Sequence, residues 1–278
     1  MNYLKVVFKD KRATVGVIIL LFFVVLAIFA PFIAPYSPTY MGFTPWEGIS
    51  LRHLLGTTFN GQDVFSQLIW GTRISLEVGL AVGFFSTFIA VVIGFLAGYF
   101  PGVIDDVLNL ITNVFLVIPG LPLMIIISAY EPNKGTGMII FIISLTGWAW
   151  GARVLRPQIM SLKNREFVNA SVVVGEGSFH IIFYDILPNT AGLIAANFFG
   201  SAIYGVLSEA ALEFLGLGNP NAVSWGTMLF WAENSQATFF GQWEWLLIPG
   251  LFIALLSTSF ALMNFAVDEI TNPRLRKR

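Results

Sequence analysis

Residues 165–188 read REFVNASVVVGEGSFHIIFYDILP and lie between two long apolar segments. The first part, residues 165–174, predicts one short helix. Gly175 and Gly177 follow and are expected to break that helix, because glycine permits the backbone angles that a sharp reversal requires. The stretch therefore predicts two short helices that meet at a glycine.

The second half of this stretch leads back into an apolar segment. Ser178 is a candidate N-cap for a helix over residues 179–187, and Pro188 marks the entry to the next long segment. Both short helices carry apolar side chains, namely Val168, Val172, Phe179, Ile182 and Phe183. A solvated loop does not need this much apolar area. The pattern therefore predicts a segment that presses into a groove on a soluble partner.

The composition is that of a membrane protein. Of the 278 residues, 56% are hydrophobic and 11% are charged, whereas soluble domains carry about 25% charged residues. We predict an all-α polytopic membrane protein, because several apolar runs approach the roughly 20 residues that cross a bilayer. Its six transmembrane helices are expected over residues 14–34, 74–99, 107–130, 137–155, 189–215 and 245–267.

Details within these runs qualify the prediction. The basic start and the first apolar run resemble a signal peptide, but the length of the run favours an uncleaved span. Pro119 and Pro122 predict a kink in the third span. Two G-x-x-x-G patterns in the second span predict close helix packing; they are formed by Gly79 and Gly83, and by Gly94 and Gly98.

The basic residues predict the orientation. Three of the 15 Lys and Arg residues (Arg52, Arg73 and Lys134) fall on one side. The side that holds the other twelve is expected to be cytoplasmic, which places both termini in the cytoplasm. These twelve are Lys5, Lys9, Lys11, Arg12, Arg153, Arg156, Lys163, Arg165, Arg274, Arg276, Lys277 and Arg278. Arg153 and Arg156 are expected to snorkel to the lipid head groups.

Two large loops then lie outside the cell, over residues 35–72 and 216–242, and the first is expected to end in a short helix over residues 63–70. Their composition fits either a docking surface for an extracytoplasmic partner or a lid of lipid-facing loops.

The sequence excludes several kinds of chemistry. There is no cysteine, and His53 and His180 lie too far apart in the sequence to indicate a metal site, so we expect structural roles for both. No G-x-x-x-x-G-K-[ST] run that would cradle phosphates is present, and no basic stripe indicates nucleic acid. We expect no enzyme activity and no cofactor on this chain. If such a chain moves a solute across the membrane, the energy is expected to come from an ion gradient or from a partner subunit.

Two acids near the end of the fifth span are candidate functional residues. Glu209 and Glu213 are four residues apart and share a helix face. An ionisable side chain at membrane depth indicates function, because its burial is expensive. The acids either line the substrate path or an outer gate, or carry protons, or lie where the helix end already protrudes into water. The same alternatives hold for Glu77.

Residues 165–188 resemble the E-A-A loop of ABC importer permeases. That loop follows the pattern E-A-A-x-x-x-G and, about ten residues later, I-x-L-P or I-L-P. Here the triplet is Asn169-Ala170-Ser171, the glycine is Gly175, and the end is Ile186-Leu187-Pro188. Asn replaces the Glu of the pattern, which removes any ion pair that the Glu would make with its partner.

Further motifs resemble those of the C-type permease of dipeptide, oligopeptide and nickel importers. Gln62 and Gln67 stand where that family usually has Arg, Thr58 replaces Asp, and Glu213 replaces Ser. The segments that carry the resemblance are residues 53–57, 61–66, 71–76, 145–149, 208–218, 224–226, 249–250 and 272–276.

The resemblance implies a fold and a set of partners. It implies the type I importer fold, with a first helix and its loop over residues 1–72 and a core of five membrane helices over residues 73–278. The implied partners are a second permease in a heterodimer, two ABC ATPase subunits that bind ATP and Mg, an extracytoplasmic binding protein and membrane lipid. The implied contact with an ATPase is a coupling helix, whose residues would be Arg165, Glu166, Asn169, Ala170, Ser171, Gly175, Gly177 and Pro188.

The resemblance implies import of di- and oligopeptides as the commonest family role. Oligosaccharides stay open, because aromatic residues of the outer loop could stack on sugars. Nickel is disfavoured, because it prefers imidazole ligands and structural roles are expected for both His53 and His180. A gradient-driven transporter is a more remote alternative, since neither inverted repeats nor a membrane-centred ion site is visible.

Overall fold

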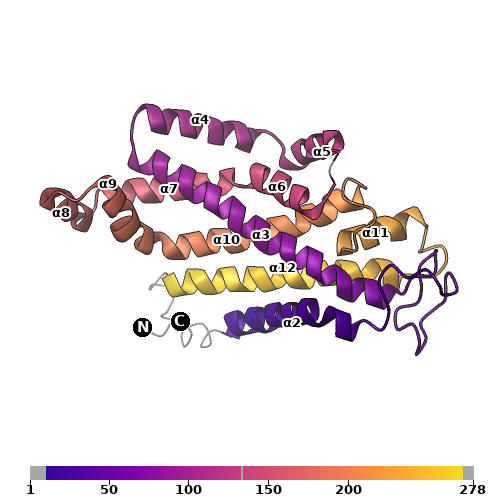
Figure 1. Cartoon of the computed structure of the whole chain (residues 1–278). Helices are drawn as coiled ribbons and strands as arrows, with labels where there is room; N and C mark the ends of the chain where they lie inside the picture. The colour runs from indigo at the N-terminus through magenta and orange to yellow at the C-terminus, as the bar shows by residue number, and fades with distance from the viewer. Residues whose placement is uncertain (1–10, 133, 272–278) are drawn as a thin grey trace.

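Long apolar helices run side by side in the computed structural model of this chain, which describes residues 11–132 and 134–271 (Figure 1). Within these residues the regular structure is helical, and Thr57 and Asp63 form an isolated β-bridge. The elements are α2 (Lys11–Ile33), α3 (Val64–Tyr99), α4 (Val103–Val117), α5 (Gly120–Tyr130), α6 (Thr136–Gly147), α7 (Ala149–Lys163), α8 (Glu166–Val174), α9 (Ser178–His180), the π-helix η1 (Ile181–Ile186), α10 (Leu187–Phe214), α11 (Trp225–Asn234) and α12 (Glu244–Thr271).

The lengths of these helices confirm the membrane class. Four described helices are long and apolar enough to cross a bilayer, and the number rises to six if each of two bent pairs counts as one span. The pairs are α4 with α5, bent by 87°, and α6 with α7, bent by 44°. The predicted all-α polytopic fold is confirmed, and the first, fifth and sixth predicted spans correspond to α2, α10 and α12.

The expected separate helix over residues 63–70 is wrong. It is the first part of α3, which runs unbroken for 36 residues from Val64 to Tyr99. Gly71 does not form a turn; it is a packing position, since an added Cβ there would lie 3.1 Å from Trp225 Cδ1. Asp63 is the N-cap, and its carboxylate accepts a 2.8 Å hydrogen bond from the Ser66 amide.

Breaks divide the third and fourth predicted spans. At Pro119, the N-cap of α5, the expected kink is a bend of 87°. The fourth span was predicted over residues 137–155; in the structure it breaks at Trp148 and continues to Lys163. The Trp148 ring is buried, with its centroid 5.2 Å from that of Phe115. This places the break where α4 and the α6–α7 pair pack together.

Glycines set the packing around α3, as the two G-x-x-x-G patterns predicted. An added Cβ would lie 2.6 Å from Val206 at Gly79 and 3.1 Å from Ala202 at Gly83, both on α10. On the second pattern, an added Cβ at Gly98 would lie 2.7 Å from the Arg156 carbonyl oxygen of α7. Because no side chain intervenes, α3 approaches the backbones of both neighbours.

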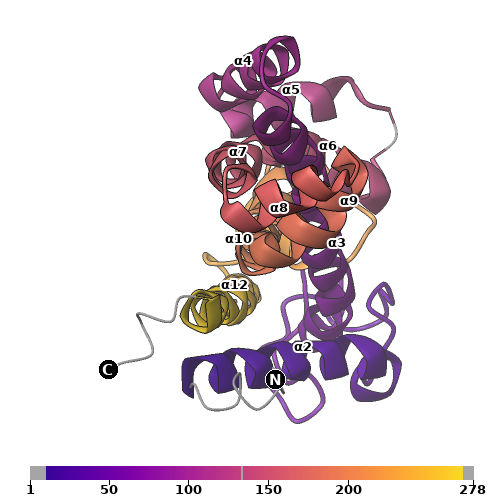
Figure 2. The same ribbon diagram turned by 90° about the vertical axis from the view of Figure 1, so that its left-hand side faces the viewer.

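The two ends of the bundle differ. The segment with α8 and α9 lies at the same end as the start of α2 and the end of α12, whereas α11 and the loop before α3 lie at the opposite end (Figures 1 and 2). The described basic residues at helix ends, Lys11, Arg12, Lys163 and Arg165, belong to the first end. The other basic residues predicted there, Lys5, Lys9, Arg274, Arg276, Lys277 and Arg278, lie outside the described residues, as do residues 272–276 of the motifs.

Candidate functional site

The segment between α7 and α10 has the predicted helix–glycine–helix shape. Helix α8 ends at Val174, and Gly175 follows in the left-handed conformation with φ of 94°. The Gly175 amide donates to the Val172 carbonyl at 3.0 Å, and the next amide, of Glu176, donates to the Ser171 carbonyl at 3.0 Å. These bonds satisfy carbonyls that the helix end would otherwise leave without partners. The chain therefore reverses direction at Gly175.

The second half of this segment differs from the predicted short helix over residues 179–187. Gly177 occupies the N-cap position, and Ser178 is the first helical residue, so the predicted N-cap at Ser178 is wrong. Helix α9, η1 and α10 form one continuous helical segment of 37 residues, Ser178–Phe214. Pro188 cannot donate to the carbonyl four residues earlier. The preceding turn widens into a π-helix, in which the Leu187 amide donates to the Ile182 carbonyl.

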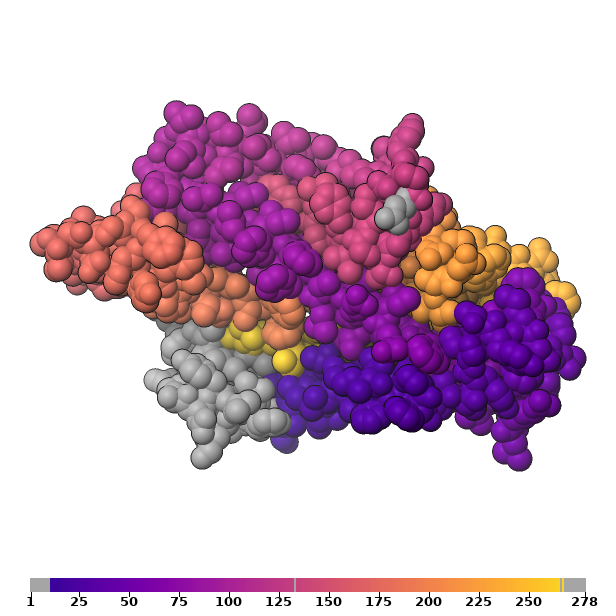
Figure 3. All heavy atoms as spheres, viewed as in Figure 1, coloured from indigo at the N-terminus to yellow at the C-terminus, as the bar shows by residue number. Residues whose placement is uncertain are grey.

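This segment carries an exposed apolar surface, which we call the loop surface. Phe179 is 70% exposed and Val173 is 86% exposed. The loop surface consists of Val172, Val173, Val174, Phe179, Phe183 and Tyr184. Val168 is not part of it, contrary to the prediction, because it packs inward with Ile181 and Ile186. In Figure 3 the segment projects beyond the rest of the chain.

The other residues predicted for the coupling loop lie around this surface. Arg165 occupies the N-cap position of α8, and Glu166 lies in the first turn. Asn169 and Ala170 are exposed, and the Ser171 hydroxyl donates to the Phe167 carbonyl at 3.4 Å. Gly175, Gly177 and Pro188 are also exposed. The structure thus brings the predicted set together at one end of the bundle.

Glu209 and Glu213 lie at the junction of α10, α3 and α11. Their side chains are buried, with residue exposures of 0% and 2%, so the interpretation that they protrude into water is wrong. The Ser75 hydroxyl of α3 donates to Glu209 Oε2 at 3.4 Å, and the Ser224 hydroxyl donates to Glu213 Oε2. Glu77, by contrast, is exposed. The buried pair therefore joins three elements, and its role in a substrate path or gate stays a prediction.

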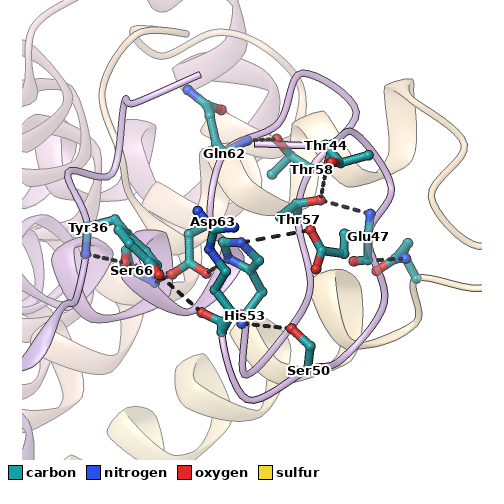
Figure 4. A network of polar contacts seen from close by, with 12 residues as sticks. Tyr36, Thr44, Glu47, Ser50, His53, Thr57, Thr58, Gln62, Asp63 and Ser66 are labelled. Carbon is teal, nitrogen blue, oxygen red and sulfur yellow. Dashed lines mark hydrogen bonds and ion pairs between the residues drawn. The ribbon is translucent and has the colours of Figure 1, made fainter. Parts of the chain in front are cut away.

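The loop before α3 is organised by His53 (Figure 4). Its Nδ1 lies 2.8 Å from Asp63 Oδ1, and both residues are fully buried. The other carboxylate oxygen of Asp63 accepts a 2.6 Å hydrogen bond from the Ser66 hydroxyl, to which the Tyr36 amide donates in turn. His180 lies elsewhere, 3.5 Å from Glu176 on the exposed loop. The structural role expected for His53 is confirmed.

One ion pair escaped the sequence analysis. Arg156 of α7, which was expected to snorkel to head groups, donates from Nε and Nη2 to the two carboxylate oxygens of Asp105, each at 2.6 Å. The two residues are 51 positions apart. No local spacing could have paired them.

Comparison with known proteins identifies the family of this chain. Residues 90–277 match the family described as the binding-protein-dependent transport system inner membrane component. The chain belongs to this permease family. Residues 4–48 of the permease also match the N-terminal transmembrane domain of oligopeptide transport permease C. The predicted resemblance to ABC importer permeases is confirmed.

Curated relatives cover nearly the whole permease. The dipeptide transport system permease protein of Escherichia coli (strain K12) is 38% identical over 281 residues, which are 97% of this chain and 91% of the relative. That of Bacillus subtilis (strain 168) is 35% identical over 274 residues, 97% of this chain and 84% of the relative. The oligopeptide transport system permease protein of Bacillus subtilis is 32% identical over 272 residues, with 97% and 88% covered. These relatives are named as transport permeases and not as enzymes.

Proposed function

We propose that this permease forms half of the translocation path of an ABC importer for di- and oligopeptides. The observation that carries the proposal is identity of 32–38% across 97% of the chain with permeases named for dipeptide and oligopeptide transport. Nickel is not favoured, because His53 is buried against Asp63 and is not available as a metal ligand facing a path. Oligosaccharide transport has no relative among these permeases to support it.

The loop surface is the proposed contact with an ATPase subunit. It combines exposed aromatic and valine side chains with a rigid glycine turn, and it projects from the bundle. An apolar surface of this kind is expected to be covered by a partner. Since the chain has no phosphate-cradling motif, ATP and Mg are proposed to bind on the partner ATPases.

The assembly proposed here has four further components. They are a second permease, two ATPases and an extracytoplasmic binding protein. The end of the bundle with α8 and α9 then faces the cytoplasm together with both termini, and α11 and the loop before α3 face the binding protein.

ATP binding is coupled to transport through the difference in its affinity for the two states of the transporter. ATP closes the ATPase dimer and shifts the permeases between inward-open and outward-open states, by as much as its affinity for the two states differs. A shift from 1:99 to 99:1 requires about 5.5 kcal/mol. The loop surface is the contact through which the ATPase shifts the equilibrium of the permease.

The proposal is tested by reconstituting the chain in liposomes with its second permease, ATPases and binding protein, and by measuring ATP hydrolysis with short peptides or oligosaccharides. Stimulation by peptides alone is expected. Stimulation by sugars alone would overturn the substrate assignment and leave the coupling intact. If the chain does not associate with an ATPase, the coupling proposal fails.

A further inference from the structure

A hollow of about 570 Å³ lies between α4, the α6–α7 pair, α10 and α12. Small residues make the room, since Gly147, Gly151 and Gly200 line it together with Ala149 and Ala196. On α10 it spans residues 193–204, in the middle of the membrane-length helix. The hollow is separate from both the loop surface and the buried acids.

The chemistry of the hollow is polar but uncharged. Of the described residues that line it, none carries an Asp, Glu, Lys, Arg or His side chain. Its side chains that can hydrogen-bond are those of Thr146, Trp150, Asn197, Ser201, Tyr204 and Asn264. Such a surface cannot select the sign of a charge. It can exchange hydrogen bonds with neutral donors and acceptors.

Several of these groups have no partner in the described part of the chain. The hydroxyls of Ser201 and Tyr204 make no hydrogen bond there, and Asn264 Oδ1 also has none. The Tyr204 hydroxyl lies against Gly120, where an added Cβ would be 2.9 Å from it. Unpaired polar groups at membrane depth are costly unless they line a water-filled space or are buried against protein. The hollow is therefore not a lipid-facing surface.

A second groove on the same helix supplies the contrast. It is lined by Phe84, Phe88, Ala195 and Phe198 among other apolar residues, without a charged side chain among them. Such a surface suits lipid tails. Helix α10 thus presents a polar hollow and an apolar groove at similar depth, as expected for a helix between a water-filled path and lipid.

We propose that the hollow is a binding wall for the main chain of the peptide in transit, on which Ser201, Tyr204 and Asn264 exchange hydrogen bonds with peptide amides. This inference rests on the proposed function. A peptide main chain presents the same neutral donors and acceptors whatever its side chains, and the absence of ionisable residues from the hollow matches that ligand. The hollow then accepts peptides of different side-chain charge.

The first test uses accessibility. The chain has no cysteine of its own, so a single introduced thiol reports one position. Ser201→Cys and the control Ala195→Cys are placed on the same helix, in the hollow and in the apolar groove. The assembled transporter in liposomes is treated with a water-soluble thiol reagent. Ser201→Cys is expected to react many times faster than Ala195→Cys, and trialanine with binding protein and ATP is expected to slow the reaction.

The second test removes a hydroxyl. Tyr204→Phe keeps the ring, and Tyr130→Phe, at an 87% exposed residue of α5, is the matched control. Loss of one hydrogen bond to the passing peptide predicts about tenfold slower uptake for Tyr204→Phe. The control is expected to transport as the parent does.

The outcomes separate this inference from the proposed function. If trialanine still stimulates ATP hydrolysis but Ser201→Cys reacts no faster than Ala195→Cys, the hollow is covered by the second permease or by lipid, and the inference is overturned alone. Labelling that trialanine does not slow, or normal uptake by Tyr204→Phe, also overturns it. If no peptide stimulates hydrolysis in the parent complex, the proposed function itself fails.

Discussion

Arg156 and Asp105 form a two-pronged ion pair between α7 and α4, with both nitrogen–oxygen distances at 2.6 Å. The Asp105 side chain is 12% exposed and that of Arg156 is 28% exposed. Since α3 packs on α7 through Gly94 and Gly98, the pair fixes α4 to a part of the bundle that is already held by backbone contacts.

Removal of this ion pair is expected to weaken the bundle. Asp105→Ala leaves the Arg156 guanidinium without its partner, and hydrogen bonds to charged groups are worth about 1.5–3 kcal/mol. The melting temperature of the purified protein in detergent should fall. Arg156→Met and the double variant complete a cycle, in which the double variant is expected to be less destabilised than the sum of the single variants. Additive effects would show that the two side chains do not interact.

Gly175 is expected to be indispensable for coupling. Gly175→Leu places a side chain on a φ of 94°, which costs about 1–2 kcal/mol for residues other than glycine. The turn between α8 and α9 should open, and peptide uptake should fall relative to ATP hydrolysis. Both rates are measured in liposomes.

Gly177→Leu is the matched control for this change. An added Cβ has open space at either glycine, but Gly177 has a φ of −75°, which any residue adopts. The variant should keep uptake coupled to hydrolysis. Equal effects of the two changes would show that side-chain bulk on the loop matters, and not the left-handed backbone.

The buried acid Glu213 is expected to act through hydrogen bonding to Ser224. Glu213→Gln preserves an acceptor for the Ser224 hydroxyl, whereas Glu213→Leu leaves the hydrogen of that buried hydroxyl without an acceptor, at a cost of about 1–3 kcal/mol, although its oxygen still accepts from the Thr227 amide. The thermal stability of Glu213→Leu should therefore be lower than that of Glu213→Gln. Glu77→Leu, at an exposed position, serves as the control and should change stability little.

Two glycine-to-alanine changes are expected to act in opposite directions. Gly98→Ala drives a methyl group to 2.7 Å from the Arg156 carbonyl oxygen, a backbone atom that cannot turn away, and should cost about 1–3 kcal/mol. Gly250→Ala, within α12 and with open space around an added Cβ, should stabilise by up to about 1 kcal/mol through helix propensity. Thermal unfolding in detergent compares them. A loss of stability in Gly250→Ala would contradict the open space around an added Cβ at that position.

The sequence alone predicted the helical membrane fold, the glycine contacts of α3 and the turn at Gly175. These follow from local rules: apolar run length, small-residue spacing and the backbone freedom of glycine. It failed where tertiary contact overrides local signals. The helix predicted over residues 63–70 continues through Gly71, on which Trp225 packs, and is the first part of α3. Trp148 gave no sign of a break in the sequence; in the structure its ring packs against Phe115, which lies 33 positions earlier in the chain.

The candidate site was predicted unevenly for the same reason. The loop surface is contiguous in sequence, so its residues could be named, although the inward direction of Val168 depends on contact with Ile181 and Ile186. The hollow draws its residues from α4, α5, α6, α7, α10 and α12. Its polar groups are single side chains in apolar runs, and nothing in their spacing indicates that they converge. Burial of Glu209 and Glu213 likewise depends on elements distant in sequence.

The continuous helical segment Ser178–Phe214 has a consequence for timing. At 1.5 Å per residue, 37 residues span about 55 Å, more than the thickness of a bilayer. Phe179 on the loop surface, Ser201 in the hollow and Glu213 at the opposite junction therefore belong to one continuous helical segment, which turns near the π-helix Ile181–Ile186 (Figure 1). Because these residues share one helical segment, a displacement of the loop surface by an ATPase would move the opposite junction directly, without a series of side-chain contacts between them. Under the proposed coupling the two ends of the segment would be displaced together, and the π-turn at Ile181–Ile186 is the place where such a segment would bend.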